Sequence, residues 1–273
     1  MAEENRQQEL AGRVAVVTGV SRRQGIGYAV AARLAGMGAS LLVQHHRPHD
    51  LDKPWGADDL EAVLDGLRGR LQAGAGIVDI AADLTAAPAS ERVMQAAVER
   101  FGHVDILVCN HARSGGDGDL AALDADMLDL HWKVNTRSTL LLTKAFAAQH
   151  DGKRAGRAIW MTSGQQLGAM RGEVAYASAK AALAGVVATV ADELVERRIL
   201  LNAVNPGPVN TGYLNTETTD RDAGTLGKVL DSFPLGRFGE PDDPARLVAW
   251  LASDESRWVV GQVLNTEGGF RRW

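Results

Sequence analysis

Cysteine is almost absent from this sequence of 273 residues, and the one example is Cys109. A single cysteine cannot form an internal disulfide, and a zinc site built on cysteines needs several of them. His45, His46 and His49 fall on a predicted loop, in a spacing that matches no strong metal-ligand pattern. We therefore expect no metal site.

Long apolar runs and an excess of basic charge are also missing. No run approaches the roughly 20 apolar residues that cross a bilayer. The first ten residues, MAEENRQQEL, are polar and acidic where a signal peptide has a basic and then an apolar stretch. A net charge of -5 argues against an extended surface for nucleic acid or anionic membranes. We expect a cytoplasmic protein that binds neither nucleic acid nor membrane.

What the sequence does contain is a regular alternation of short apolar runs and longer amphipathic stretches. Several of the short runs are continuously apolar, which indicates strands covered on both faces. Their alternation with helices predicts a doubly wound α/β Rossmann fold, in which a mostly parallel sheet of about seven strands carries helices on both faces. The expected strands are residues 13–18, 40–44, 76–81, 105–109, 157–162, 199–204 and 262–265, and the expected helices are residues 25–37, 57–71, 89–101, 124–149, 174–197 and 241–252.

No linker, repeat or low-complexity segment divides the chain, so we expect one catalytic domain over residues 1–273. Residues 1–10 form a polar tail. Two stretches, residues 45–55 and 212–233, have the character of inserted surface chain. The second of these, with Tyr213 and Leu214 among many polar residues, is the expected substrate loop or lid.

A glycine cluster follows the first expected strand directly and precedes a helical pattern. Gly19 permits a tight turn, while Gly25 and Gly27 allow a pyrophosphate and the sheet to approach the backbone closely. The phosphates then lie at the positive end of the helix. A plain strand-to-helix turn would use the same residues, but the position in the α/β pattern favours a dinucleotide site.

The end of the second strand indicates which dinucleotide is bound. NAD sites commonly place a carboxylate there for the ribose 2′-hydroxyl, and this chain has none before Asp50. Arg47 follows the strand instead, and Arg22 and Arg23 lie in the glycine loop, where they match a 2′-phosphate. Alternatively, these three arginines are ordinary loop residues whose charges are solvated and bind no phosphate. We predict that NADP(H) is preferred, with NAD(H) possible; Asp83, after the third strand, either binds the adenine amino group or caps the next helix.

Tyr176 and Lys180 are four residues apart on an expected helix and therefore share one face. A phenol has an ordinary pKa of about 10, and a neighbouring ammonium favours its ionised form. Tyr176 can then exchange a proton with a substrate oxygen while a hydride moves to or from a nicotinamide. The pair alone is a weak signal, because aromatic residues and lysines often share a helix face for structural reasons.

With its other motifs, the chain resembles the short-chain dehydrogenase/reductase family over residues 10–270, in the single-domain branch. Asn110-His-Ala112 ends the fourth strand, Asn135 lies in KVNTRS, Ser163 precedes Tyr176 by thirteen residues, and Asn205-Pro-Gly-Pro-Val-Asn-Thr211 follows the sixth strand. The closing segments PLGRFGEPDD and GQVLNTEGG resemble those of its 3-oxoacyl thioester reductases.

The resemblance implies roles for these residues. Tyr176 is the general acid or base, Lys180 lowers its pKa and binds the nicotinamide ribose, Ser163 holds the substrate carbonyl, and the backbone of Asn135 holds a relay water. Cofactor contacts are implied for Ser21, Ile26, Leu84, Asn110, Ala112, Pro206, Gly207, Val209 and Thr211, beside the glycines, arginines and Asp83 already named.

The chain departs from the family pattern in three places. Five residues separate Gly19 from Gly25, as in the enoyl-thioester reductase branch, although that branch spaces its tyrosine and lysine more widely. Tyr176-x-x-x-Lys180 therefore favours carbonyl reduction. His111 and Arg113 replace a usual asparagine and glycine, and Arg113 is equally compatible with the cofactor, an anionic substrate or a surface role.

These observations predict an NADP(H)-dependent reductase of a ketone, with a 3-oxoacyl thioester as one candidate substrate. An NAD(P)-dependent dehydrogenase of a secondary alcohol, sugar or steroid is the alternative within the enzyme class. A non-catalytic NADP-sensing protein is the alternative outside it, since a fold alone does not fix a function. The resemblance also implies a homodimer or homotetramer formed through the helices expected at residues 124–149 and 174–197.

Overall fold

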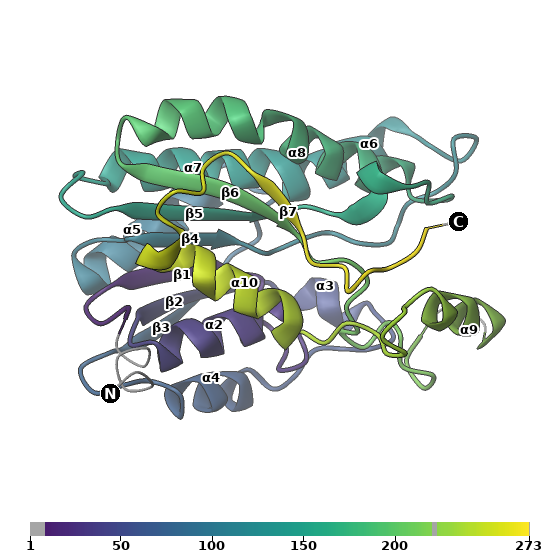
Figure 1. Ribbon diagram of the computed structural model, residues 1–273, viewed down its shortest axis with the longest axis horizontal. Helices are drawn as coiled ribbons and strands as arrows, with labels where there is room; N and C mark the ends of the chain where they lie inside the picture. The colour runs from purple at the N-terminus through teal and green to yellow at the C-terminus, as the bar shows by residue number, and fades with distance from the viewer. Residues whose placement is uncertain (1–8, 220–222, 273) are drawn as a thin grey trace.

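The computed structural model describes residues 9–219 and 223–272, and its centre is one sheet (Figure 1). The sheet has seven strands in the order β3-β2-β1-β4-β5-β6-β7, and every pair is parallel. The predicted Rossmann fold is thereby confirmed. The strands are β1 (Val14–Thr18), β2 (Ser40–His45), β3 (Ile77–Ala81), β4 (Ile106–Cys109), β5 (Gly156–Met161), β6 (Ile199–Asn205) and β7 (Val263–Asn265).

Helices cover both faces of the sheet, as Figure 1 shows. One apolar core joins the sheet to α2 (Ile26–Gly36), α4 (Leu60–Arg68) and α10 (Asp242–Ala252). A second core joins it to α5 (Ala89–Phe101), α7 (Ser138–Gln149) and α8 (Val174–Val195). The central strands β1, β4 and β5 are buried along their whole length, because both cores press on them.

The helix expected over residues 124–149 is interrupted. It divides into α6 (Ala125–His131), a π-helical segment (Trp132–Arg137) and α7. The Ser138 and Thr139 hydroxyls donate to the carbonyls of Val134 and Asn135, at 2.5 and 3.1 Å. Such bonds compete with the regular helical pattern, and single π turns occur frequently at functional sites.

Both inserted stretches contain a helix that the sequence did not predict. Residues 45–55 include α3 (Arg47–Leu51), and residues 212–233 include α9 (Ala223–Asp231). Short 3-10 turns follow β5 (Gly164–Leu167) and α10 (Asp254–Ser256). In Figure 1, α9 lies at the end of the molecule where the chain also finishes, and α3 is seen between α10 and α9. Most of the polar tail, residues 1–8, lies outside the described residues.

One expectation about apolar runs was wrong. Among the described residues, α8 is long and apolar enough to cross a membrane, with 22 residues and a mean hydropathy of 1.6. Length and composition alone are weak evidence for a span, since the core helices of α/β proteins share both properties. Here α8 packs on β6 and on the π-helical segment, which identifies it as a helix of the second core.

Candidate active site

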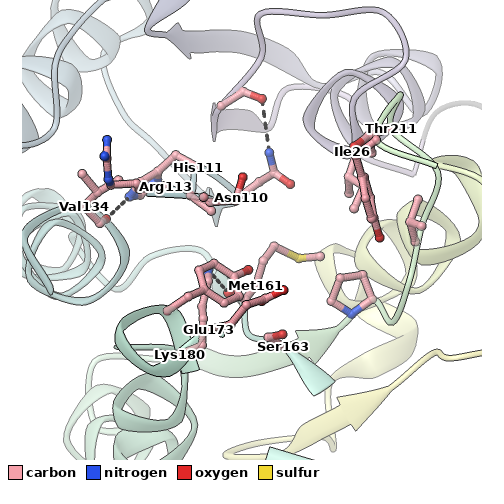
Figure 2. A pocket seen from close by; sticks show the side chains of 18 of the residues that line it. Ile26, Asn110, His111, Arg113, Val134, Met161, Ser163, Glu173, Lys180 and Thr211 are labelled. Atoms are coloured by element: carbon pink, nitrogen blue, oxygen red, sulfur yellow. Dashed lines mark hydrogen bonds between the residues drawn. The ribbon is translucent and has the colours of Figure 1, made fainter. Parts of the chain in front are cut away.

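A cavity of about 1010 Å³ opens at the carboxyl ends of the strands. The strand order reverses between β1 and β4, and ligands of doubly wound sheets bind where such a reversal opens a crevice. Figure 2 shows Ile26 and Thr211 on one side of this cavity, Arg113 on the other, and Ser163 and Lys180 below them. The cavity therefore joins the glycine loop to the Tyr176 region.

The glycine loop is closely packed against the loop that follows β4. Gly19 has a φ of +73°, and a Cβ on it would lie 2.8 Å from the Cα of His111. A Cβ on Gly27 would lie 2.4 Å from the Gly19 carbonyl oxygen. The first residue before α2, Gly25, brings no capping side chain. The first-turn N–H groups of α2 are therefore available to an anion.

Most of the residues predicted for the cofactor and for catalysis line the cavity. Asp83 is exposed there and accepts the N–H of Thr85 at 2.8 Å, so it supports a turn before α5. Gly27, Arg23, Arg47 and Asn135 do not line it. The lining members of the predicted set are Gly19, Ser21, Arg22, Gly25, Ile26, Asp83, Leu84, Asn110, Ala112, Ser163, Tyr176, Lys180, Pro206, Gly207, Val209 and Thr211.

The three arginines expected near a 2′-phosphate have different surroundings. Arg23 is exposed and pairs with Asp58 at 3.3 Å. Arg22 pairs with Asp50 at 3.3 Å and donates to the carbonyl of Thr211 at 2.5 Å. The Nε of Arg47 is buried and finds no hydrogen-bond partner among the described residues.

Asp50 was overlooked as a contributor to the site. It lies on α3, where its carboxylate accepts the Ser21 hydroxyl and pairs with Arg22. The inserted helix thus rests on the glycine loop. Trp55, just beyond α3, continues the contact, because its ring faces the Arg22 guanidinium at 5.9 Å and the Tyr213 ring at 6.3 Å. No local spacing in the sequence signals these contacts.

Lys180 is buried, with 3% of its surface exposed, and lies close to Tyr176. Its Nζ donates to the Met161 carbonyl at 2.8 Å and lies 5.9 Å from the centre of the Tyr176 ring. Burial lowers the pKa of Lys180 to about 8. At neutral pH the ammonium is therefore still mostly charged, although its proton is held weakly.

The pKa of Tyr176 differs from the expected direction. We expected Lys180 to lower it, but in this structure burial and the nearby Glu173 raise it, while a hydrogen bond with Ser163 opposes the rise. Loss of hydration outweighs the neighbouring charge, because the ammonium has no direct bond to the phenol. The Tyr176 phenol is therefore protonated at neutral pH.

Asn135 lies in the π-helical segment and holds the loop after β4 in place. Its side-chain oxygen accepts the N–H of Arg113 at 2.8 Å, and its amide donates to the Arg113 carbonyl at 3.1 Å. Its backbone carbonyl accepts the Thr139 hydroxyl. His131, one turn earlier, is fully buried and meets the Tyr176 ring edge to face at 6.1 Å. This histidine is a neighbour of the phenol that sequence reasoning missed.

Asp117 is a second residue missed by sequence reasoning. Its carboxylate accepts the N–H groups of Tyr176 at 2.7 Å and of Ala175 at 3.0 Å. The residue before α8, Glu173, makes no capping bond with its side chain. Asp117 therefore caps the helix of Tyr176 from a loop 59 residues away in sequence.

His111, which replaces the family's second asparagine, is buried between two strands and the π-helical segment. Its ring nitrogens lie 2.7 Å from the hydroxyls of Thr18 and Ser138. Burial lowers its pKa to about 3, so the ring is neutral at physiological pH. The neutral ring bridges the hydroxyls of Thr18 and Ser138, as a neutral asparagine amide could. The end of β1 therefore stays connected to the start of α7 although His111 stands in place of asparagine.

The residues of the cavity fit a nicotinamide dinucleotide. The glycine loop leaves no room for side chains where a diphosphate approaches α2, and Asn110 ties this loop to β4 by donating to the carbonyls of Thr18 and Gly19 at 3.1 and 3.2 Å. Ser163, Tyr176 and Lys180 lie farther along the same cavity. By contrast, the described residues contain no cluster of three His, Cys, Asp or Glu suited to a metal.

Comparisons with known proteins identify relatives over nearly the whole chain. A family profile described as "Enoyl-(Acyl carrier protein) reductase" matches residues 19–271. The "Uncharacterized oxidoreductase YjdA" of Bacillus subtilis is 35% identical over 262 residues, covering 95% of this chain and 97% of that protein. The "Hydroxynaphthalene reductase-like protein Arp2" of Metarhizium brunneum is 34% identical over 271 residues, covering 95% of each chain.

Solved structures agree with these relatives. A short-chain dehydrogenase/reductase from Serratia marcescens is 31% identical, with a TM-score of 0.80 over 96% of this chain and 99% of that one. A dehydrogenase/reductase from Sinorhizobium meliloti is also 31% identical, with a TM-score of 0.82 over 98% of this chain and 99% of that one.

Proposed function

Since this chain belongs to the short-chain dehydrogenase/reductase family and is an oxidoreductase, we propose that it reduces a ketone to a secondary alcohol with NADP(H). The observation that carries this proposal is the position of Ser163, Tyr176 and Lys180. All three line one cavity, which also reaches the N-terminus of α2.

The reaction divides between the cofactor and these side chains. When bound, the nicotinamide supplies the hydride to the carbonyl carbon. Ser163 donates a hydrogen bond to the carbonyl oxygen and stabilises the negative charge that develops there. Tyr176 donates its proton to the same oxygen, and Lys180 stabilises the tyrosinate that remains. The Asn135 carbonyl, which already accepts the Thr139 hydroxyl, would hold the relay water of the proton path with its second lone pair.

The raised pKa of Tyr176 supports reduction as the direction of the reaction. A general acid must hold its proton before the reaction, and the phenol does so throughout the neutral range. Oxidation of an alcohol would need the tyrosinate, which is the form that burial disfavours. An alcohol, sugar or steroid dehydrogenase is therefore the second candidate.

Preference for NADP(H) rests on the end of β2. Residues 45–47 are His-His-Arg, so no carboxylate stands where the ribose 2′-hydroxyl of NAD is commonly bound. Arg47 has a buried Nε without a hydrogen-bond partner among the described residues, and a 2′-phosphate would satisfy it. Arg22 is already engaged by Asp50 and Arg23 by Asp58, so Arg47, which lies between the lining residues His46 and Pro48, is the primary determinant.

The substrate class follows from the apolar part of the cavity wall. This part includes the apolar side chains of Met170, Leu214, Val229 and Phe270. They favour an acyl chain or an aromatic ring beside the reacting carbonyl. We propose a 3-oxoacyl thioester first and a polycyclic aromatic ketone second, the latter because some relatives are named hydroxynaphthalene reductase-like proteins.

The test is consumption of NADPH with a 3-oxoacyl thioester, beside NADH and a Tyr176→Phe variant. We expect turnover that prefers NADPH and falls by about 10²–10⁴-fold in the variant, because the proton donor is lost. The variant should still bind NADPH. Turnover with only aromatic ketones would move the substrate to the second class. NADPH binding without turnover across a ketone and alcohol panel would favour a cytoplasmic NADP-sensing protein instead.

A further inference from the structure

Two cations line the cavity without a side-chain partner in the part of the chain that the structure describes. Lys53 follows α3, and Arg113 lies on the loop after β4. Neither side chain makes a hydrogen bond or an ion pair within residues 9–219 and 223–272, and the Nε of Arg113 is buried. An unpaired guanidinium in a cavity wall is costly unless an anion joins it.

Both cations end at the same short segment, residues 115–116. A Cβ on Gly115 would lie 2.9 Å from Lys53 Nζ, and a Cβ on Gly116 would lie 2.8 Å from an Nη of Arg113. His49 lines the cavity nearby, and its pKa is lowered by burial and then by Lys53, with Arg113 contributing. Three basic side chains therefore gather on one wall.

This wall is connected to the glycine loop through α3. Asp50 rests on Ser21 and Arg22, and Lys53 follows it by only three residues. Lys53 thus reaches from the glycine loop across to Gly115. Arg113 is held in position by Asn135, which bonds both its backbone N–H and its carbonyl.

We propose that Lys53 and Arg113 form a clamp that binds the diphosphate of the dinucleotide from the side opposite the N-terminus of α2. The helix terminus offers N–H groups on one side, and the clamp offers two full charges on the other. The carboxylate of Asp50 does not pair with the clamp, because it is already paired with Arg22. The carboxylate of Asp52 is exposed, so solvent hydrates it. The inference rests on dinucleotide binding by the proposed function, but not on the choice between NADP(H) and NAD(H).

The test measures ligand binding by calorimetry for Lys53→Met, Arg113→Met and the double variant. The ligands are NADPH, NADH, ADP-ribose and adenosine. Each single variant should raise the Kd for the first three about tenfold or more, because each loses a charge-assisted bond. Adenosine, which has no phosphate, should bind as before. The double variant should lose less than the product of the two single losses, because both residues bind one group.

Two matched variants serve as controls, Lys144→Met on α7 and Arg92→Met on α5, where both residues are exposed. Each control removes one positive charge of the same kind at a position outside the cavity lining, so every Kd should be unchanged. Raising the salt concentration should weaken NADH binding more in the wild type than in the double variant.

Three results would overturn the clamp. A loss confined to NADPH would assign the pair to the 2′-phosphate. Unchanged dinucleotide binding with a raised KM for an anionic substrate would assign it to that substrate. Unchanged binding of every ligand would show that the cations have no ligand at all. A wild type that binds no dinucleotide would instead refute the proposed function, and this outcome is separable because it precedes any substitution.

Discussion

Lys180 combines a catalytic position with an energetic cost to the fold. Burial lowers its pKa from an ordinary 10.5 to about 8. Below pH 8 the folded protein therefore holds a charged ammonium in a buried site, whereas the unfolded chain hydrates it freely. Sites built for chemistry are often less stable than the same sites filled with apolar side chains.

We predict that Lys180→Met abolishes turnover and raises the melting temperature of the cofactor-free protein at pH 7 by about 2–4 °C, which corresponds to roughly 1 kcal/mol. The unfolded chain keeps the lysine proton up to about pH 10.5, while the folded protein loses it near pH 8. The wild type therefore gains stability as the pH rises from 8 to 10.5, and its difference from the variant narrows there. Thermal melts at pH 7, 9 and 10.5, with Lys144→Met as control, would measure this. A lower melting temperature for Lys180→Met at pH 7 would contradict it.

At the scale of single elements, the helix of Tyr176 depends on a residue far away in sequence. The Asp117 carboxylate bonds the Tyr176 and Ala175 N–H groups, so it fixes where α8 begins. Since the Tyr176 side chain extends from the first turn of α8, the start of this helix also determines where the phenol points. Asp117 is therefore a positioning residue.

We predict that Asp117→Ala lowers kcat about tenfold and stability by about 1 kcal/mol, as for the loss of other helix caps. The Kd for NADPH should be unchanged, because the Asp117 carboxylate bonds the N–H groups of Gly118, Ala175 and Tyr176 and, among the described residues, none of the glycine loop. Asp119→Ala is the matched control, since Asp119 caps only its own loop by accepting the N–H groups of Ala121 and Ala122. If both variants lowered kcat equally, the effect would belong to the loop and not to the cap.

The same elements show how far the sequence alone could lead. The strands were predictable because burial on both faces requires continuous apolar runs. The spacing of Tyr176 and Lys180 has a chemical reason, whereas Ser163 came from the resemblance to the family. The structure brings the three to one cavity, and their roles remain predictions. The π-helical segment at Asn135 was not predictable, because it depends on hydroxyl bonds within one turn of an otherwise regular helix. The contacts of Asp50 and Asp117 join segments that are distant in sequence, and no local period encodes them. The raised pKa of Tyr176 depends on burial, which only the assembled fold creates.

For the whole molecule, the outer face of α8 remains to be explained. Only 33% of its most apolar window is buried within the chain. Ala181, Gly185 and Ala188 are exposed and recur at helical spacing, so they form one smooth stripe of small residues. Since the inner face of α8 packs on the sheet, a second copy of the chain is a more suitable cover for this stripe than a lipid bilayer.

We predict a homodimer or homotetramer in solution, formed through α7 and α8, with a subunit mass of 29.1 kDa. Ala188→Arg should yield a smaller species in sedimentation velocity, because a long charged side chain cannot enter a closely packed helix pair. Its circular dichroism should match the wild type, since Ala188 is exposed in the single chain. Ala87→Arg is the control, as Ala87 is equally exposed on the turn before α5. A wild type that sediments as a monomer, or an Ala188→Arg variant with the wild-type mass, would leave the α8 stripe without a role in assembly.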